Sequence, residues 1–269
     1  MRNLFLNLIV LISITISTSL FGADKKFKKA PLVVGMELQY PPFEMSDGDG
    51  NPTGVSVEIA KALGNFLGRE VKIENIAWTG LIPSLQSGKV DLVISSMNIT
   101  DKRKKVVDFS DPYAQSGLTL LINKDSKVTG WENIDQKGNV VAVKSGTTGA
   151  ILAKKELKKA EVRYFDEPAA CVMEVSQGKA DAYIYDPLTV YNNHKKHRAT
   201  TRVNLKNIPN TAGAWGMAIK KGNDKLKSKV NKFIKSFRKS GGFEKLEKKY
   251  LGELKAEFDK NKIPSFFDL

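Results

Sequence analysis

Apolar residues recur along this chain in two alternating patterns, short β-branched runs and longer stretches with a helical repeat. The runs at residues 32–36, 71–76 and 92–94 predict strands. Apolar positions spaced three and four apart predict a helix over residues 55–67 and a shorter one around residues 81–87, each followed by a glycine. Strands that alternate with helices indicate an α/β fold with a largely parallel sheet.

The second half of the chain repeats this alternation. Strands are expected at residues 139–143, 161–165 and 180–185, with helices at 150–158 and 168–177. The segments Gln-Ser-Gly-Lys-Val-Asp-Leu-Val-Ile (86–94) and Ser-Gln-Gly-Lys-Ala-Asp-Ala-Tyr-Ile (176–184) both read as a helix end, a glycine stop and an Asp that opens a strand. We therefore expect two similar lobes, each a mostly parallel sheet flanked by helices, whose strand ends face a common crevice where ligands bind.

Two extended segments rich in small residues connect the predicted lobes. Residues 116–120 and 210–214 form the expected two-strand hinge, residues 31–115 with 215–260 the first lobe, and residues 121–209 the second. A helix over residues 224–239 has one apolar face, which predicts packing on the first lobe rather than on a membrane. A further short helix is expected over residues 243–251.

The N-terminus has the pattern of a secretory signal peptide. Residues 4–20 are almost entirely apolar or hydroxylated, follow the single basic residue Arg2, and precede the small residues Gly22 and Ala23. The run is short for a permanent membrane span. We expect cleavage after residues 1–23 and export of a soluble protein to the periplasm. Cys171 is the only cysteine, so no intrachain disulfide can form, and we interpret it as a small buried residue.

Charge narrows the possible partners. The chain has 43 Lys and Arg against 29 Asp and Glu, a formal net charge of +14. Its lysines are spread along the sequence without aromatic interleaving, so we expect no nucleic-acid partner. His194 and His197 lack a neighbouring carboxylate or Cys, and no nucleophile–base motif occurs, so we expect no metal, no cofactor and no catalytic residue. We expect a monomer.

Residues 91–113 contain the first candidate site. A strand ends in polar residues, among them Ser96 and Asn98, and Thr100 begins a helical turn that includes Asp101 and Arg103. Hydroxyls, N–H groups and a guanidinium that converge in this way suit a carboxylate. The alternative is a loop with an ordinary surface Arg among four basic residues, and the spacing does not decide between them.

Three further features lie at strand ends. The turn over residues 145–149, after Lys144, offers N–H groups and hydroxyls to an anion, or is a glycine-containing turn without a ligand. Asp186 suits an ammonium group, or caps a helix that starts at Pro187. Four aromatic residues stand at strand–loop junctions of the first lobe: Tyr40, Phe43, Trp78 and Tyr113. Each one alone is better explained as a core or lobe-surface residue, but four near one edge are candidates for a binding wall.

These motifs together resemble the bacterial family 3 solute-binding proteins, the periplasmic receptors of ABC importers for polar amino acids. The resemblance runs from about residue 31 to residue 251. It is carried by Tyr-Pro-Pro-Phe-Glu (40–44), Gly-Val-Ser-Val-Glu-Ile-Ala (54–60), Trp-Thr-Gly-Leu-Ile-Pro-Ser-Leu-Gln-Ser-Gly-Lys-Val-Asp (78–91), Ile-Thr-Asp-Lys-Arg (99–103), Val-Asp-Phe-Ser-Asp-Pro-Tyr (107–113), Val-Lys-Ser-Gly-Thr-Thr-Gly (143–149) and Tyr-Asp (185–186).

The resemblance implies a clamp for a free L-amino acid in a cleft between two closing lobes. Arg103 is expected to pair with the ligand α-carboxylate, helped by backbone N–H groups near Ser96 and Thr148. Ser96 and Asn98 are expected to add polar contacts, and Asp186 to hold the α-ammonium group.

It also implies which residues surround the ligand side chain. Tyr40 and Trp78 are expected to sandwich its carbon skeleton. Glu37 and Lys144 are expected to contact the end of the side chain and so determine specificity. An acidic and a basic reader together favour a neutral polar side chain such as that of glutamine. If Glu37 reads the ligand alone, a basic amino acid such as arginine, lysine or histidine follows. Tyr185 stands where glutamine-binding members have a His.

The function implied is that of a binding protein, not an enzyme, which delivers its amino acid to an inner-membrane ABC permease. Two alternatives remain. A periplasmic cyclohexadienyl or arogenate dehydratase on the same fold would need a general acid such as Glu37 or Lys144. A ligand-sensing module of a larger receptor is the other, although the chain ends shortly after the predicted fold.

Overall fold

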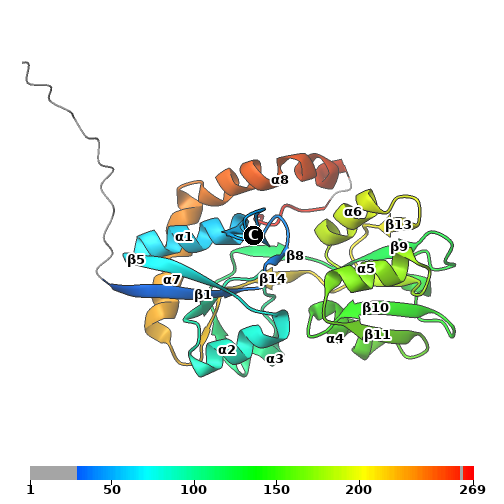
Figure 1. The fold of residues 1–269 in the computed structure, drawn as a ribbon, viewed down its shortest axis with the longest axis horizontal. Coiled ribbons are helices and arrows are strands. Elements are labelled where there is room, and N and C mark those ends of the chain that lie inside the picture. Colours follow the sequence, from blue (N-terminus) through cyan, green and yellow to red (C-terminus); the bar gives the residue numbers. More distant parts are fainter. Residues whose placement is uncertain (1–28, 261–262) are drawn as a thin grey trace, which may run out of the picture.

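Two α/β lobes stand side by side in the computed structural model, which describes residues 29–260 and 263–269 (Figure 1). The two-lobe α/β fold expected from the sequence is confirmed. The predicted signal peptide, residues 1–23, lies outside the described residues. Within the described part, no helix combines the length and apolarity needed to span a bilayer.

The sheet of the first lobe has five strands in the order β5-β1-β6-β15-β7. Three parallel strands lie next to one another, and β15 joins them antiparallel to its neighbours. The strands are β1 Lys29–Met36, β5 Arg69–Asn75, β6 Leu92–Val93, β7 Val107–Phe109 and β15 Ala218–Lys220. The alternation of side chains along β1 sends Val34 to one face and Val33 to the other, so both faces are covered.

The sheet of the second lobe repeats this plan in the order β11-β10-β12-β9-β13. Its three parallel strands β11, β10 and β12 are followed by β9 and β13, which are antiparallel to their neighbours. The strands are β9 Thr119–Asn123, β10 Val140–Lys144, β11 Glu161–Phe165, β12 Ala182–Tyr185 and β13 Thr201–Asn204. The internal repeat seen in the sequence therefore corresponds to two sheets of the same design.

Helices cover both faces of each sheet. One face of the first sheet packs in a common apolar cluster with α1 Val55–Leu67, α7 Asp224–Lys239 and α8 Gly242–Lys260, and the other face with α2 Leu81–Ser87. In the second lobe, α4 Thr148–Glu156 covers one face, and α5 Pro168–Ser176 with α6 Pro187–Lys196 cover the other. The predicted bounds of α1 and α7 are confirmed, and Gly68 ends α1 at φ 65°, as a left-handed C-cap requires.

An antiparallel strand pair crosses between the lobes. β8 Ala114–Ser116 pairs with β14 Gly213–Trp215. The predicted hinge ranges, 116–120 and 210–214, overlap this pair at residues 116, 213 and 214. A small separate sheet in the first lobe consists of β2 Gln39–Tyr40, β3 Glu44–Ser46 and β4 Pro52–Thr53. Two 3-10 turns, Trp78–Gly80 and Trp131–Asn133, and the single helical turn α3 Asp101–Lys104 complete the elements.

The C-terminal segment is longer and better packed than the sequence analysis expected. The helix predicted to end at residue 251 continues to Lys260, because Leu254 and Phe258 extend its apolar face. Beyond it, Ile263, Phe266 and Phe267 are buried in the core of the first lobe. The backbone N–H of Gln115 in β8 donates to the Phe266 carbonyl at 2.7 Å. The C-terminal segment is therefore attached to one of the crossing strands.

One residue of the second lobe joins the core of the first. Leu188, at the start of α6, is 1% exposed and belongs to the same apolar cluster as Phe258 and Phe266. In Figure 1 the end of α8 reaches over α6. The lobes therefore share apolar packing near the crossing strands.

Candidate functional site

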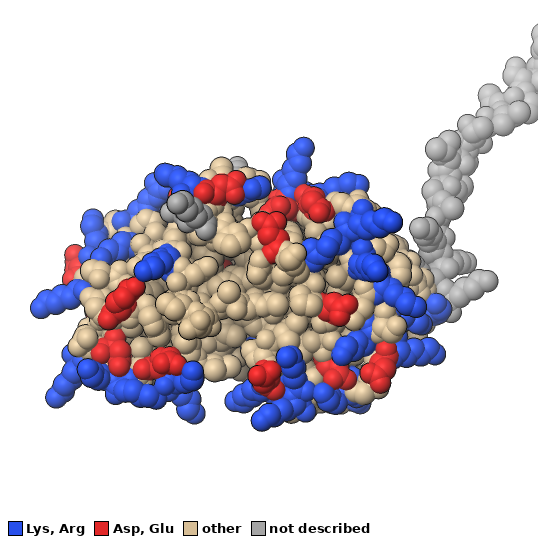
Figure 2. Space-filling model, turned by 180° about the vertical axis from the view of Figure 1, so that it is seen from behind, with Lys and Arg blue, Asp and Glu red and all other residues tan. Residues whose placement is uncertain are grey.

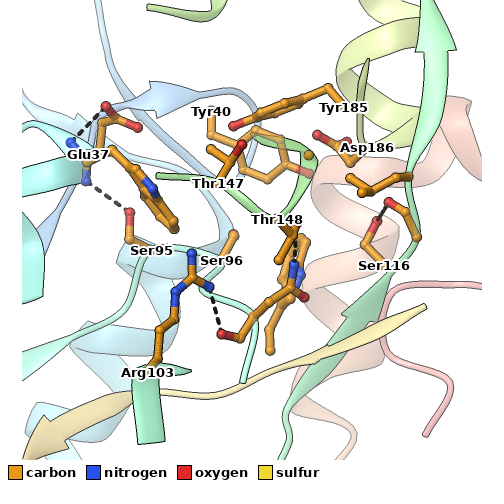
Figure 3. Close-up of a pocket in the computed structure, with 16 residues that line it drawn as sticks. Glu37, Tyr40, Ser95, Ser96, Arg103, Ser116, Thr147, Thr148, Tyr185 and Asp186 are labelled. Carbon is orange, nitrogen blue, oxygen red and sulfur yellow. Dashed lines mark hydrogen bonds between the residues drawn. The ribbon is translucent and has the colours of Figure 1, made fainter. Parts of the chain in front are cut away.

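A cleft of about 580 Å³, part of which opens to solvent, lies where the carboxyl ends of the two sheets face each other. Both lobes and the crossing segments contribute to its wall. The lining residues are Glu37, Tyr40, Trp78, Ser95, Ser96, Asn98, Arg103, Ser116, Gly117, Leu118, Thr147, Thr148, Gly149, Tyr185, Asp186 and Trp215. Ten of them are labelled in Figure 3.

The structure brings eight of the nine residues predicted for the site to this wall. These are Glu37, Tyr40, Trp78, Ser96, Asn98, Arg103, Thr148 and Asp186. The ninth, Lys144, does not line the cleft; its side chain is 1% exposed and lies behind Glu37, with which it forms an ion pair.

The guanidinium of Arg103 links the two lobes. Its position follows from local sequence, because the Thr100 hydroxyl accepts the Arg103 backbone N–H and caps α3 as predicted. One guanidinium nitrogen donates to the Asn98 carbonyl at 2.7 Å (Figure 3). Another donates to the Gly146 carbonyl of the second lobe at 3.1 Å. The group lies 5.2 Å from the centre of the Trp78 ring, a cation–π geometry. Burial lowers the pKa of Arg103 to about 10, so it stays charged at neutral pH.

Asp186 is the helix cap that the sequence offered as one interpretation, and it also lines the cleft. Its carboxylate accepts the Thr189 backbone N–H at 3.0 Å and so caps α6, while the residue also lines the cleft. The residue is 7% exposed, and burial raises the pKa of Asp186, against the opposing effect of the Thr189 N–H. Neither Arg103 nor Asp186 belongs to an ion pair between described residues. The cleft therefore contains a buried cation and a buried anion that do not pair with each other.

Glu37 and Lys144 neutralise each other across the lobe boundary. Glu37 follows β1, Lys144 ends β10, and the Lys144 ammonium donates to one oxygen of Glu37. The other oxygen accepts the Trp78 backbone N–H at 3.0 Å. The sequence analysis expected both residues to read the ligand side chain. In the structure they form one neutral pair, and only Glu37 reaches the wall.

A third interlobe contact lies at the start of α4. The Asn98 side-chain amide donates to the Thr148 hydroxyl at 3.1 Å. Thr147 caps α4 through its hydroxyl, and Gly146, at φ 72°, makes the turn that directs its carbonyl to Arg103. The predicted turn over residues 145–149 thus contributes Thr147, Thr148 and Gly149 to the wall.

The aromatic wall differs from the one predicted. Tyr40 and Trp78 line the cleft, but Phe43 and Tyr113 are fully buried in the core of the first lobe. For these two residues the core interpretation is confirmed and the wall interpretation was wrong. Tyr185 and Trp215 line the cleft instead. Trp215 packs edge-on against Tyr40, with ring centres 6.0 Å apart. Its place in the second crossing segment, next to small residues, was the signal that could have identified it.

Sequence reasoning also missed several residues in the wall and behind it. The Ser95 hydroxyl accepts the Glu37 backbone N–H at 3.0 Å, which fixes the strand end that carries Glu37. Ser116, Gly117 and Leu118 line the cleft from the crossing segment. Glu44 does not reach the wall, but it accepts the Ser96 hydroxyl at 2.8 Å and is itself fully buried.

Comparison with known proteins gives consistent results. The profile of the bacterial extracellular solute-binding proteins, family 3, matches residues 32–253. The chain is 33% identical over 229 residues to the L-cystine-binding protein TcyJ of Escherichia coli strain K12, covering 85% of each chain. It is 32% identical over 230 residues to the ABC transporter glutamine-binding protein GlnH of Bacillus subtilis strain 168, covering 84% of this chain and 83% of GlnH.

Two solved structures extend the comparison. An ancestral arginine-binding protein bound to glutamine superimposes with a TM-score of 0.76 at 32% identity, over 83% of this chain and 99% of that one. The ancestral amino acid-binding protein AncCDT-1, a precursor of cyclohexadienyl dehydratase, superimposes with a TM-score of 0.73 at 38% identity, over 82% and 94%.

Proposed function

The chain belongs to the bacterial extracellular solute-binding proteins of family 3, and on this basis we propose that its cleft holds a single L-amino acid between Arg103 and Asp186. The protein is an amino-acid receptor of an ABC transporter, as its relatives are. Members of the family work in the periplasm or outside the cell, and we place this protein in the periplasm after removal of residues 1–23.

One observation supports the proposed clamp of Arg103 and Asp186 around an amino acid. A buried guanidinium and a buried carboxylate line the same cleft without an ion pair of their own. Charges taken out of water are costly unless they are paired. A zwitterion supplies the two missing partners, since its carboxylate matches the Arg103 fork and its ammonium group matches Asp186. Tyr40, Trp78, Tyr185 and Trp215 enclose the remaining apolar part.

The Glu37–Lys144 pair supports a neutral ligand side chain. A cationic side chain next to Glu37 would compete with Lys144 for the same carboxylate, and an anionic one would face that carboxylate directly. We therefore place a neutral polar side chain such as that of glutamine first, and a basic one second.

Transport follows from the way in which the lobes meet. Arg103 and Asp186 come from different lobes, so a ligand bound to both favours the closed arrangement and shifts the hinge equilibrium towards it. The closed form then presents both lobes to the inner-membrane permease in one fixed relation.

A dehydratase is the second candidate, because a precursor of cyclohexadienyl dehydratase is among the similar structures. Such an enzyme needs a general acid that faces the substrate. Glu37 lines the cleft and is one candidate, but its carboxylate is occupied by Lys144 and the Trp78 N–H. Binding therefore accounts for this geometry better than catalysis does.

A thermal-shift screen against the standard L-amino acids and L-cystine tests the function. A ligand at about 100 times its dissociation constant should stabilise the fold by roughly 2.7 kcal/mol. No stabilisation by any of these compounds would contradict the proposal. Incubation with prephenate and arogenate checks the alternative, and turnover of either would establish an enzyme.

A further inference from the structure

Glu44 is a buried acid that contacts the cleft wall from behind. It begins β3, is fully buried, and forms no ion pair with a described residue. Its carboxyl oxygen Oε1 accepts two hydroxyl groups, from Ser96 at 2.8 Å and from Ser56 in the first turn of α1 at 3.0 Å. Glu44 therefore ties a residue of the cleft wall to the core of the first lobe.

Ser96 needs such support because of its backbone. Its φ is 48°, in the left-handed region that residues with a Cβ rarely adopt. Among the described residues other than glycine, only Asn210 shares a positive φ. A strained residue of this kind persists when its surroundings hold it in place.

The residues close to Ser96 on either side make contacts that shape the cleft wall. Ser95 before it fixes the backbone of Glu37, and Asn98 after it contacts both Arg103 and Thr148. A change of the Ser96 backbone would therefore move the donors and acceptors on either side of it.

We propose that Glu44 is a positioning residue for ligand binding: by accepting the Ser96 hydroxyl it holds Ser96 in the left-handed conformation that orders the cleft wall between Ser95 and Asn98. This role rests on the proposed function, since it concerns the same cleft. Glu44 acts through Ser96 and does not touch the ligand.

The electrostatic setting agrees with a hydrogen-bonding role. Burial raises the pKa of Glu44 to about 8, with smaller contributions from the nearby carboxylates of Glu37 and Asp186, while the Ser96 and Ser56 hydroxyls oppose the rise. The group is therefore mostly protonated at neutral pH, and a buried neutral carboxyl needs hydrogen bonds rather than a cation.

Two substitutions of Ser96 separate positioning from ligand contact. Ser96→Ala and Ser96→Gly both remove the hydroxyl, but only glycine adopts a positive φ without strain. Affinity is measured by calorimetry with the compound that binds the unchanged protein most tightly among L-glutamine, L-arginine and L-cystine. Ser96→Gly should bind at least five-fold more tightly than Ser96→Ala; equal affinities for the two variants would overturn the proposal.

Substitutions of Glu44 complete the test. Glu44→Met removes the acceptor and should weaken binding roughly five- to thirty-fold, the factor that corresponds to about 1–2 kcal/mol of backbone strain at Ser96. Adding Ser96→Gly to Glu44→Met should recover most of that loss, which a general structural role of Glu44 would not allow. Where Glu44→Met does not fold, Glu44→Gln keeps both volume and acceptor, and should bind more tightly than Ser96→Ala.

The outcomes distinguish the positioning role of Glu44 from the proposed amino-acid binding on which it rests. If none of the three amino acids nor any other standard L-amino acid binds the unchanged protein, the proposed function fails and the role of Glu44 fails with it. If the unchanged protein binds but Glu44→Met retains its affinity, or Ser96→Gly does not rescue it, only the role of Glu44 is rejected.

Discussion

Lys144 of the second lobe forms a buried ion pair with Glu37 of the first, and it lies directly behind Glu37, which lines the cleft. The side chains are 1% and 8% exposed, respectively, so water screens the pair very little. The pair therefore sets the charge at this part of the cleft wall and also connects the two lobes.

Breaking this pair should change ligand selectivity. Lys144→Met leaves the Glu37 carboxylate at the wall without its cation, so a cationic ligand side chain gains a partner. We expect the ratio of the L-arginine to the L-glutamine association constant to rise at least about ten-fold, the equivalent of roughly 1.4 kcal/mol. Calorimetry with both ligands measures it. The matched control is Glu37→Gln with Lys144→Met, in which no charge remains and the shift should disappear.

The same substitution should lower stability. Removing one partner of a buried pair costs about 3–5 kcal/mol, because the other charge stays buried and uncompensated. Replacing both, with Glu37→Leu and Lys144→Met, should recover most of this loss. Urea unfolding of the single and double variants measures the difference. A double variant no more stable than Lys144→Met would show that the pair is not what the single substitution disrupts.

Arg103 should dominate affinity. Arg103→Lys keeps the charge but not the planar fork that pairs with a carboxylate and contacts the Asn98 and Gly146 carbonyls. We expect affinity to fall by about 2–5 kcal/mol for Arg103→Ala, and by a smaller amount for Arg103→Lys, in calorimetry with the bound amino acid. The ligand-free fold should persist in both. Unchanged affinity of Arg103→Ala would refute the carboxylate assignment.

Asp186 allows its two roles to be separated. Asp186→Asn keeps a good cap for α6 but removes the charge that the ligand ammonium group needs. It should bind the ligand at least about 2 kcal/mol more weakly while its unfolding free energy stays the same or rises, because a buried charge is lost. Asp186→Ala should lose about 1 kcal/mol of stability as well, since the cap is gone. Binding by Asp186→Asn at full strength would exclude the ammonium role.

Glu44 should make stability depend on pH. The pKa of its carboxyl is raised from the usual 4.5 to about 8 in the folded protein, so folding favours the protonated form. This contribution to stability is fully present below pH 4.5 and is lost as the pH rises towards 8. The unfolding free energy of the unchanged protein should therefore fall relative to Glu44→Gln by up to about 1.4 kcal/mol per pH unit in that window. Denaturant titrations from pH 4 to pH 9 give the comparison, and a pH-independent difference would contradict it.

Much of the architecture could be predicted because it depends on local pattern. Helices α1 and α7 carry clear apolar faces, and Gly68 marks the end of α1. The position of Arg103 was also predictable, since Thr100 caps its turn within a few residues. The end of α8 was missed because Leu254 and Phe258 continue its apolar face among many charged residues.

The rest depended on contacts between distant parts of the chain. Nothing near Glu37 or Lys144 in the sequence indicates that they meet, since 107 positions separate them and each comes from a different lobe. Phe43 and Tyr113 stand at strand–loop junctions like Tyr40, but the C-terminal segment covers their side of the lobe and buries them. Glu44 belongs to a recognisable motif, yet its contact with Ser96 spans 52 positions.

The place of Leu188 in the core of the first lobe bears on the free energy needed to separate the two lobes. Leu188 belongs to α6 of the second lobe, whereas Phe266 is held to β8 through the Gln115 N–H. Any separation of the lobes must either pull Leu188 out of its apolar surroundings or carry the C-terminal segment along with it. Each square ångström of apolar surface returned to water costs about 25 cal/mol. The free energy of separating the lobes therefore depends partly on side chains that do not line the cleft.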